Sequence, residues 1–397
     1  MSDKLRVLIF SSIFPNSLEG NKGIYIFHQA KELSRSCEVR VVAPIPYVPG
    51  VLRRHPKYSM VARVPELETI DGLSVSHPRV FLTPRFGHSL YGLFFFVSLI
   101  LRIKRIKNVF KPDVLISYWV YPDGYASVWF GKILGIPVIV GGLGCDINEA
   151  EANPLRAAAV RWTLKNSSRV MAVSQAMKST MAGLGAFTDK IRAIPNGISN
   201  DFVPLDKEHA RSLVSLNLPS ADTKVILYCG RLSPEKGVNY LLDAVSLLHE
   251  HGVAFHLLLV GEGPERQRLQ DMVRVSGLER QIEFRGEVSH KEVPVLMNAV
   301  DVFCLPSIRE GWPNVLMESL ACGTPVVASA VGGIPEIVIN DNYGFLAPKQ
   351  DAQALSAALE KAIVKEWDRD SIAASMRQRT WQTVAEEIVE EIKLVLN

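Results

Sequence analysis

The sequence predicts an α/β protein made of two domains, each with a parallel sheet covered by helices on both faces. Three observations support this prediction. The chain has 397 residues, 48% hydrophobic and 21% charged, which is enough for two cores of ordinary size. Short apolar runs alternate with longer amphipathic runs in both halves. A segment rich in Pro, Gly, Asn and Ser at 194–204 separates the halves, as a linker does.

The apolar runs place the expected strands. In the first half we expect strands at 6–12, 37–44, 113–119, 136–142 and 169–174, and a helix over about 25–34. In the second half we expect them at 224–230, 255–261, 281–286, 301–307 and 324–329. Near-continuous apolar strands bounded by Gly or Pro, with helices between them, are typical of parallel sheets.

The two halves predict two Rossmann-like domains, 1–199 and 200–379, with a hinge near residue 200. A last helix is expected over 380–397. The halves differ in charge. Residues 1–200 carry 25 Lys and Arg against 13 Asp and Glu, whereas the remainder carries 19 basic and 28 acidic residues. A basic half at +12 and an acidic half at −9 indicate domains that face different partners.

Several activities lose support because their motifs are absent. There is no G-x-G-x-x-G dinucleotide fingerprint, no P-loop and no H-E-x-x-H zinc motif. The five cysteines have no metal or redox spacing and are expected to be reduced thiols. The only D-x-D, at 368–370, follows no strand and is expected to begin a helix. We therefore predict no metal, no cofactor and no nucleic-acid partner.

Two cations follow the first strand of the second half. In "YCGRLSPEKG" the strand ends at Gly230, and Arg231 and Lys236 flank a turn before a helix that begins near Val238. Cations at the carboxyl end of a strand, beside a helix N-terminus, favour a di-anion such as a pyrophosphate. An ordinary solvated turn with two surface cations explains this segment equally well.

Two acids lie eight positions apart in "SIREGWPNVLMESLACG". Glu310 is expected in the loop after a strand, and Glu318 in a helix that ends at Gly323, with Pro313 in its first turn. Eight helical residues span roughly 12 Å. That is longer than the about 5–9.5 Å between paired glycosidase carboxylates. The two acids can instead hold opposite ends of a ligand as long as a nucleotide sugar. The alternative is that neither binds a ligand, with Glu310 an ordinary loop residue and Glu318 an exposed residue of the helix.

These segments carry a family resemblance. "GRLSPEKG", "LLLVGEGPE", "FRGEV", "DVFCLPSIREGWPNVLMESLACGTPVVAS", "VGGIPEIV" and "GFL" occur in the order and spacing of the family-four retaining glycosyltransferases. The resemblance covers nearly the whole chain and is strongest over about 190–350. It implies the GT-B fold, in which a cleft separates two Rossmann-like domains, and an enzyme of cell-envelope or capsular polysaccharide biosynthesis.

The resemblance also implies roles for individual positions. Glu318 would hold the donor ribose, Glu310 the transferred sugar, and Arg231 with Lys236 the diphosphate as it leaves. Glu310, Arg231 and Lys236 are the implied catalytic residues. The backbone near Val288 would face the base, and Gly23 would let the first domain approach the diphosphate. The implied donor positions are Gly23, Arg231, Lys236, Val288, Glu310, Gly311, Asn314, Val315 and Glu318. Tyr118 and Asp146 are implied on the acceptor side.

The sequence departs from the family pattern at three positions. Tyr118 stands where the family often has a histidine, and a phenol cannot become a cation near pH 7. Leu143 stands where a polar or basic residue is usual, just before G-x-D. Pro313 replaces a common glycine and removes one backbone donor. These changes affect acceptor recognition and sugar contacts more than donor binding.

The expected reaction is retaining transfer of a sugar from a nucleotide diphosphate sugar, with UDP favoured, to a glycan or lipid-linked acceptor, without a metal. The resemblance implies an enzyme of the hexosyltransferase type. Two alternatives remain, namely another GT-B enzyme such as a nucleotide-sugar epimerase, and a catalytically silent binding subunit. In such folds the last helix commonly crosses back, so 380–397 is expected to pack on the first domain.

One segment raises the question of a membrane. Leu90 to Leu101 is apolar except for Gly92 and Ser98, and basic residues follow up to Lys107. The apolar part is too short to span a bilayer, which needs about 20 residues. The segment 90–107 is either an interfacial helix on an anionic surface or a buried crossover helix with a basic end. We expect a cytoplasmic protein, peripheral at the inner face of the cell membrane if the first alternative holds.

Overall fold

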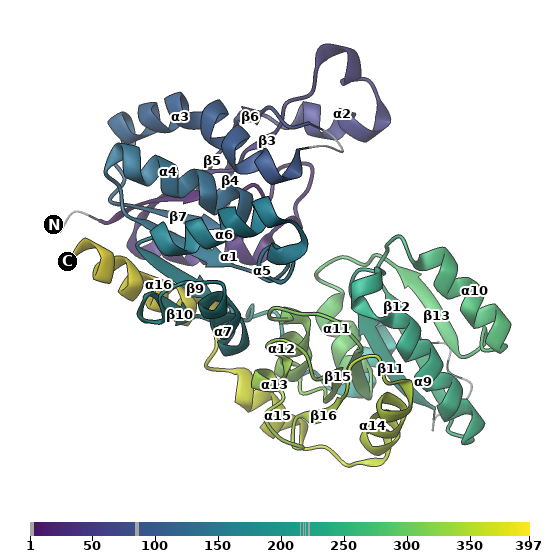
Figure 1. The fold of residues 1–397 in the computed structure, drawn as a ribbon. Helices are drawn as coiled ribbons and strands as arrows, with labels where there is room; N and C mark the ends of the chain where they lie inside the picture. The colour runs from purple at the N-terminus through teal and green to yellow at the C-terminus, as the bar shows by residue number, and fades with distance from the viewer. Residues whose placement is uncertain (1–3, 84–86, 215, 217, 219, 221–222) are drawn as a thin grey trace. The chain divides into compact units, whose positions relative to one another are not determined.

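The computed structural model describes residues 4–83, 87–214, 216, 218, 220 and 223–397. Contacts within the chain divide it into an N-terminal unit, Met1–Asn196 with Trp381–Asn397, and a C-terminal unit, Gly197–Thr380. The boundary therefore falls after residue 196, whereas the sequence placed it after residue 199. The last helix belongs to the N-terminal unit. Figure 1 shows the helices and strands of both units.

The N-terminal unit is built on an eight-stranded sheet with the order β10-β9-β8-β7-β1-β2-β5-β4. All pairs are parallel except β4 with β5. The strands are β1 Arg6–Phe10, β2 Glu38–Val42, β4 Leu67–Ile70, β5 Leu73–Ser76, β7 Val114–Tyr118, β8 Val138–Gly142, β9 Arg169–Ala172 and β10 Ile191–Ala193. Two short strands, β3 Ile45–Pro46 and β6 Arg79–Val80, pair separately.

Eight α-helices accompany this sheet in the described part of the unit. They are α1 Ile24–Ser36, α2 Pro56–Arg63, α3 Tyr91–Phe110, α4 Tyr125–Leu134, α5 Cys145–Asn148, α6 Pro154–Asn166, α7 Gln175–Gly183 and α16 Trp381–Leu396. Apolar residues of α16 at helical spacing, Trp381, Val384, Ile388 and Ile392, are buried in the same core as α1. The last helix thus completes the covering of one face of the sheet (Figure 1).

The C-terminal unit has a fully parallel six-stranded sheet with the order β13-β12-β11-β14-β15-β16. The strands are β11 Lys224–Cys229, β12 Phe255–Val260, β13 Ile282–Gly286, β14 Val302–Leu305, β15 Val326–Ser329 and β16 Gly344–Ala347. The α-helices are α8 Lys207–Leu213, α9 Val238–Glu250, α10 Arg266–Ser276, α11 Val293–Ala299, α12 Asn314–Ala321, α13 Ile334–Ile337, α14 Ala352–Val364 and α15 Arg369–Met376.

Each sheet reverses its strand order once. In the N-terminal unit the chain runs outward from β1 to β2 and then returns to β7 on the other side of β1. In the C-terminal unit it runs from β11 to β12 and β13 and then returns to β14 beside β11. Parallel α/β sheets open a crevice outside the carboxyl ends of the two strands at such a reversal. The loops after β1, β7, β11 and β14 are therefore where ligands are expected.

The structure adds strands that the apolar runs did not predict. The hairpin β4–β5 and the short strands β10 and β16 were missed. Strand β4 has an alternating, partly exposed pattern and β10 has three residues, so neither gives a buried apolar run. Both lie at an edge of the sheet, where one side of the strand has no neighbour to bury it.

The placement of the last helix also corrects the charge balance. Residues 381–397 contain four Glu and one Lys, so the N-terminal unit as folded carries 26 basic and 17 acidic residues, or +9. Two of the four glutamates of α16 form ion pairs within the unit. The buried Glu391 accepts from Arg169 at 2.6 Å and lies 3.3 Å from Arg192. Arg192 also contacts the exposed Glu390 at 2.7 Å.

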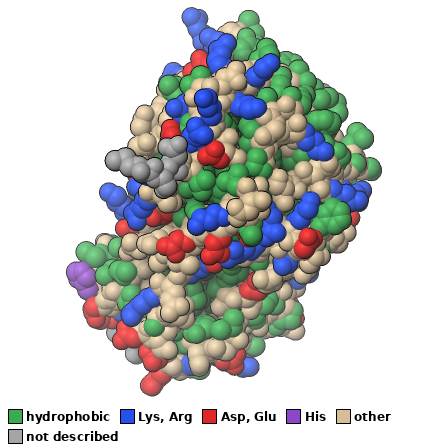
Figure 2. All heavy atoms as spheres, turned by 90° about the vertical axis from the view of Figure 1, so that its left-hand side faces the viewer, with side chains coloured by type: hydrophobic (Ala, Val, Ile, Leu, Met, Phe, Trp, Pro, Cys, Tyr) green, Lys and Arg blue, Asp and Glu red, His purple; other side chains and the backbone are tan. Residues whose placement is uncertain are grey.

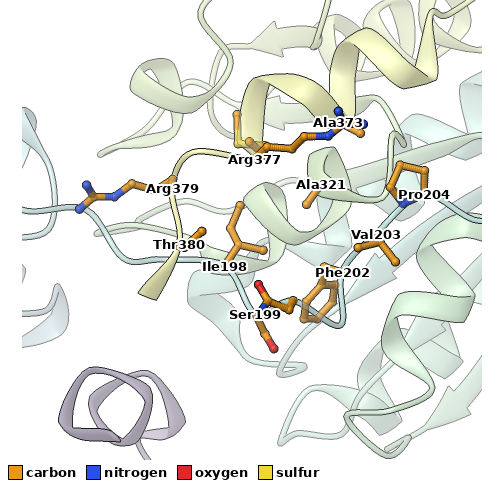
Figure 3. Close-up of a pocket in the computed structure, with 12 residues that line it drawn as sticks. Ile198, Ser199, Phe202, Val203, Pro204, Ala321, Ala373, Arg377, Arg379 and Thr380 are labelled. Carbon is orange, nitrogen blue, oxygen red and sulfur yellow. The ribbon is translucent and has the colours of Figure 1, made fainter. Parts of the chain in front are cut away.

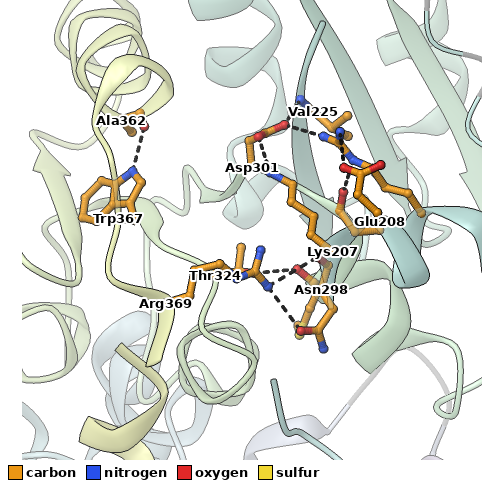
Figure 4. A network of polar contacts seen from close by, with 12 residues as sticks. Lys207, Glu208, Val225, Asn298, Asp301, Thr324, Ala362, Trp367 and Arg369 are labelled. Carbon is orange, nitrogen blue, oxygen red and sulfur yellow. Dashed lines mark hydrogen bonds and ion pairs between the residues drawn. The ribbon is translucent and has the colours of Figure 1, made fainter. Parts of the chain in front are cut away.

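A polar network holds the C-terminal unit together at the amino ends of its strands (Figure 4). Asp301, just before β14, accepts from the backbone N–H of Val225 at 2.7 Å and from Arg211 of α8 at 3.0 Å, and it also pairs with Lys207. Arg369 of α15 donates to Asn298 and to the carbonyl of Cys322, both at 3.2 Å. These charge-assisted contacts stabilise the edge of the sheet opposite the crevice.

Candidate active site

The carboxyl end of β11 carries the two predicted cations. Arg231 follows the strand and is exposed. A short 3₁₀ turn, Pro234–Lys236, then leads into α9, whose first residue follows Gly237. The turn is fixed locally, because Tyr228 donates its hydroxyl to the carbonyl of Arg231 at 2.8 Å. Both cations therefore lie at the strand reversal.

Lys236 makes the central contact of this edge. Its Nζ lies 2.6 Å from Oε1 of Glu310, in the loop after β14. Ser307 donates its hydroxyl to the same carboxylate oxygen at 2.7 Å, and only 9% of the Glu310 side chain is exposed. The two loops are also joined through the backbone, since the N–H of Ile308 donates to the carbonyl of Glu235 at 2.9 Å. The structure thus brings together Lys236 and Glu310, which are 74 residues apart.

A third loop supports Glu310 from behind. Gly332 has φ +55, and a Cβ added there would lie 2.0 Å from the carbonyl oxygen of Glu310. The next residue, Gly333, donates its N–H to the carbonyl of Gly311 at 3.1 Å. A glycine is required at 332 both for the left-handed backbone and for this close approach. The motif "VGGIPEIV" therefore sets the position of the Glu310 loop.

Glu318 lies on α12, in a different environment from Glu310. The helix begins at Asn314, and Pro313 precedes it as the N-cap instead of lying in its first turn. The Glu318 side chain keeps some access to solvent, but the atoms crowded around its carboxyl group raise its pKa to about 7 through desolvation. A carboxyl that is costly to ionise without a ligand is typical of a functional site.

The remaining donor positions lie along the same edge of the C-terminal unit. Gly311 is buried, and Asn314 and Val315 form the first turn of α12. Val288 follows β13 by two residues and is partly buried against the core. The structure places Val288 and Gly311 in the loops after β13 and β14, and Asn314 and Val315 at the start of the helix that follows β14. Their contacts with a nucleotide sugar stay a prediction.

In the N-terminal unit, the conformation of the loop after β1 requires a glycine at position 23. Gly23 has φ +64, and a Cβ there would lie 2.0 Å from the carbonyl oxygen of Ile13. The residue is the N-cap of α1, and Ile26 donates its N–H to its carbonyl at 2.9 Å. Gly23 is thus needed for the fold of its own loop. The close approach to a diphosphate stays a prediction.

Two buried carboxylates join the loops at the reversal between β1 and β7. Asp146, in the short helix α5 after β8, accepts from the backbone N–H groups of Val120 at 2.8 Å, Leu143 at 3.1 Å and Gly144 at 2.9 Å. Asp123, in the loop after β7, accepts from the N–H and the hydroxyl of Ser12. Asp146 therefore holds a loop in place and offers its oxygens to backbone donors of its own unit.

The pKa values of both carboxyls are shifted upward. Burial raises the pKa of Asp123 to about 7, and the nearby charge of Asp146 adds to the shift. Burial also raises the pKa of Asp146 above its ordinary range, against the three backbone donors that favour its ionised form. Burial is the largest cause in both carboxyls, because ionisation costs free energy where water is excluded.

Tyr118 lies at the end of β7 but does not face outward. It is buried, its hydroxyl donates to Gln29 of α1, and Gln29 in turn donates to Asn196 at 3.0 Å. Desolvation raises the pKa of the phenol. The hydroxyl expected on the acceptor side is therefore engaged inside the N-terminal unit.

Sequence reasoning missed Ser12, Trp119 and Asp123. Trp119 directly follows β7, is half-buried, and has φ +73, which is strained for a residue with a side chain. Its N–H donates to Gly141 and its carbonyl accepts from Gly124. The dipeptide Asp-Gly at 123–124 is a common turn signal that does not point to a buried carboxylate, and no sequence pattern reveals a positive φ at a tryptophan.

The cavity drawn in Figure 3 lies elsewhere in the C-terminal unit. It has a volume of about 270 Å³ and is lined by the segment 198–204, by Ala321 of α12 and by the end of α15 with the residues after it. The two segments at the boundary of the unit meet here, since Ile198 donates its N–H to the carbonyl of Arg379 at 2.9 Å. None of the predicted donor residues lines it.

The described residues contain no group of three or more His, Cys, Asp or Glu side chains placed to hold a metal ion. Asp368, of the D-x-D sequence, is the N-cap of α15 and accepts from the N–H of Ser371 at 3.0 Å. This carboxylate begins a helix, as its position after no strand suggested.

Comparison with known proteins assigns both units. The family described as "Glycosyl transferases group 1" matches residues 216–379, and the family described as "Glycosyltransferase Family 4" matches residues 23–202. The chain belongs to the group 1 glycosyltransferases of family four. The predicted family is therefore confirmed, and the matched ranges contain all the candidate site residues.

Among curated relatives, TuaC of Bacillus subtilis (strain 168), named for teichuronic acid biosynthesis, is 26% identical over 361 residues. The match covers 90% of this glycosyltransferase and 89% of TuaC. WcaL of Escherichia coli (strain K12), named for colanic acid biosynthesis, is 28% identical over 69% of this chain and 66% of WcaL.

Solved structures confirm the predicted GT-B fold. Sucrose-phosphate synthase from Thermosynechococcus elongatus matches with a TM-score of 0.77 at 21% identity, over 99% of both chains. Anabaena Alr3699/HepE, solved in complex with UDP, matches with a TM-score of 0.75 at 20% identity, over 98% of this chain and 99% of that one.

We expect Gly332→Ala to lower the free energy of unfolding by about 3 kcal/mol, because the new Cβ must displace the carbonyl of Glu310 as well as adopt a positive φ. Gly252→Ala is the matched control. Gly252 has φ +76 with no atom within 4 Å of an added Cβ, so only the backbone cost of about 1–2 kcal/mol applies. Denaturant unfolding of both variants measures the difference. Equal losses would show that the contact with Glu310 is not rigid.

Proposed function

We propose that this chain is a retaining hexosyltransferase that moves a sugar from a UDP-sugar to a hydroxyl of a glycan or lipid-linked acceptor in envelope or exopolysaccharide synthesis. The observation that supports it most is the contact of Lys236 with Glu310, beside the exposed Arg231 at the strand reversal of the C-terminal unit. Lys236 and Arg231 can bind the two phosphates, and the paired carboxylate of Glu310 can accept hydrogen bonds from the sugar.

In this proposal the reaction depends on position and charge. The bond between the anomeric carbon and the diphosphate oxygen breaks, and its electron pair stays on the diphosphate. Arg231 and Lys236 stabilise the charge that develops there. The acceptor oxygen forms the new bond on the same face of the sugar, and its proton goes to the departing diphosphate. Glu310 orients the sugar ring, and no protein nucleophile takes part.

Two further features of the proposal rest on chemistry and on relatives. UDP is favoured because Anabaena Alr3699/HepE was solved with UDP and with UDP-glucose, and TuaC and WcaL are named for bacterial polysaccharides. Metal independence follows from Arg231 and Lys236, which can supply the charge that a metal supplies elsewhere. We place the reaction in the cytoplasm, where the five free cysteines stay reduced.

Incubation with UDP-glucose, UDP-galactose, UDP-N-acetylglucosamine and an acceptor panel tests the proposal. We expect acceptor-dependent release of UDP, a product with the donor's anomeric configuration by NMR, and full activity after chelation with EDTA. An inverted product contradicts retention, and activity restored only by Mg²⁺ or Mn²⁺ contradicts metal independence. Sugar interconversion without acceptor indicates an epimerase, and nucleotide binding without any product indicates a silent subunit.

We expect Arg231→Ala to lower kcat about 10²–10³-fold, because it removes a charged donor from the developing diphosphate. Arg231 is exposed and makes no ion pair with any residue that the structure describes, so the fold should be unchanged. Arg274→Ala, which removes an equally exposed arginine of α10 paired with Asp271, is the control. The assignment fails if the two variants turn over alike. A loss of activity in Lys236→Ala is harder to interpret, because this change also removes the ion-pair partner of Glu310.

Glu318 gives a pH prediction. Its pKa of about 7 is raised, so the carboxyl is mostly protonated at pH 6 and ionised at pH 8. Ribose hydroxyls donate to the ionised form, so the affinity for UDP-glucose should rise about tenfold from pH 6 to pH 8. UDP-glucose suits the measurement because its doubly esterified diphosphate does not titrate there.

Calorimetry of Glu318→Gln should show little pH dependence, whereas Glu310→Gln should keep the slope of the unmodified protein. The same rise with pH in Glu318→Gln would place the titrating group elsewhere. The raised pKa also means that Glu318 binds more protons when folded than unfolded, so its contribution to stability falls as pH increases from about 4.5 to 7.

A further inference from the structure

The helix α3 has two apolar faces, of which only one is buried. Phe95, Leu99 and Ile103 face the core, and Phe96 packs on Phe130 of α4 with ring centroids 5.6 Å apart. On the opposite side, Leu93, Val97 and Leu101 follow one another at intervals of four residues and are 45%, 64% and 80% exposed. We call these three residues the outer stripe. An exposed row of this kind on a helix marks an interaction surface.

Basic side chains continue the outer stripe at the end of α3. Lys104 and Arg105 are exposed and form no ion pair with any part of the chain that the structure describes. Arg102 and Lys107 are engaged, Arg102 with Glu66 and with Ser76 at 3.1 Å, and Lys107 with the carbonyl of Leu134. Only half of the basic run that the sequence offered is therefore available. Figure 2 shows apolar and basic side chains side by side on one face of the molecule.

A cleft beside this helix gathers three guanidinium groups. Arg102 and Arg105 of α3 and Arg40 of β2 line a cavity of about 270 Å³, together with the hydroxyls of Ser74 and Ser76 of β5. We call this cavity the arginine cleft. Arg40 is held over the ring of Phe110, 4.5 Å from its centroid.

Glu66 is the one carboxylate among the residues of the arginine cleft. Its side chain is 66% exposed, so its pair with Arg102 contributes little. Three arginines and two serines against one exposed acid have the charge and the donors that suit a phosphate group.

We propose that the outer stripe and the arginine cleft form one docking surface for an anionic phospholipid leaflet. The lipid phosphate binds in the arginine cleft in place of Glu66, and the outer stripe enters the boundary between head groups and acyl chains. Charge decides between this occupant and a second protein chain. The N-terminal unit carries +9, and the free cations lie directly beside the stripe.

The docking is peripheral. None of the helices in the described part of the chain is long and apolar enough to cross a bilayer. The buried face of α3 packs on α4 and on the sheet, so the helix stays part of the fold while its outer stripe touches lipid. This surface would hold the enzyme where a lipid-linked acceptor is found, but the inference does not depend on the chemistry of transfer.

Sedimentation of the full chain with vesicles tests the proposal. We expect binding to phosphatidylcholine vesicles that contain phosphatidylglycerol, weak binding to phosphatidylcholine alone, and release at high salt. The triple variant Leu93→Gln, Val97→Gln, Leu101→Gln and the single variant Arg105→Glu should each weaken binding by about tenfold or more. Binding of UDP by both variants should equal that of the unmodified protein, so loss of docking and failure of the proposed function are distinguished.

Matched controls come from the C-terminal unit. Val275, Ile339 and Val364 are 91%, 65% and 77% exposed, so replacing all three with Gln removes no less exposed apolar surface elsewhere than the stripe variant does. Arg274→Glu is the control for charge. Both should bind anionic vesicles normally.

Four results would overturn the proposal. The first is that the unmodified protein does not bind anionic vesicles at low salt. The second is that the control variants lose as much vesicle binding as the stripe and Arg105 variants. The third is that the protein binds no vesicles but forms a dimer in solution, which the stripe variant converts to a monomer. The fourth concerns inorganic phosphate. If phosphate stabilises the protein in an Arg105-dependent way while vesicles are ignored, the arginine cleft is a site for free anions.

Discussion

The reversal of strand order in each parallel sheet is the constraint on which the candidate site depends. Because β11 and β14 are neighbours with their carboxyl ends at the same edge, the loops that carry Lys236 and Glu310 meet although many residues separate them. The same reversal between β1 and β7 brings Ser12 to Asp123 in the N-terminal unit. Stabilising contacts such as those of Asp301 and Arg369 lie at the amino ends of the strands. The opposite edge is thereby left to ligands.

Buried or crowded carboxyls hold this edge in two different ways. Asp146 and Asp123 receive backbone and hydroxyl donors, so they fix loops of the N-terminal unit even though burial raises their pKa values. Glu310 receives Lys236 and Ser307, which makes it a paired group. Glu318 makes no such contact with any residue that the structure describes, and desolvation alone raises its pKa. The donor ribose that we propose would supply the hydrogen bonds that such a carboxyl lacks.

Packing explains why one helix can serve both the core and a surface. The phenylalanines of α3 divide between the two sides of the buried face, with Phe95 against Phe10 and Phe96 against α4. Burial is therefore satisfied without Leu93, Val97 and Leu101. The last helix, α16, shows the opposite case. Its apolar residues Trp381, Val384, Ile388 and Ile392 are buried in the core, and its Glu390 and Glu391 pair with Arg192 and Arg169.

The sequence by itself determined the fold class, the main strands of both sheets and the family, and it predicted which residues bind the donor. Apolar runs of buried parallel strands and the motifs between them are local, so they can be found without a structure. Tertiary structure decided which of these residues touch. The pairing of Lys236 with Glu310, the engagement of Tyr118 with Gln29 and the positive φ of Trp119 depend on contacts between distant segments. It also decided which cations of α3 remain free, because Glu66 and the carbonyl of Leu134 come from elements that no helical pattern places beside that helix.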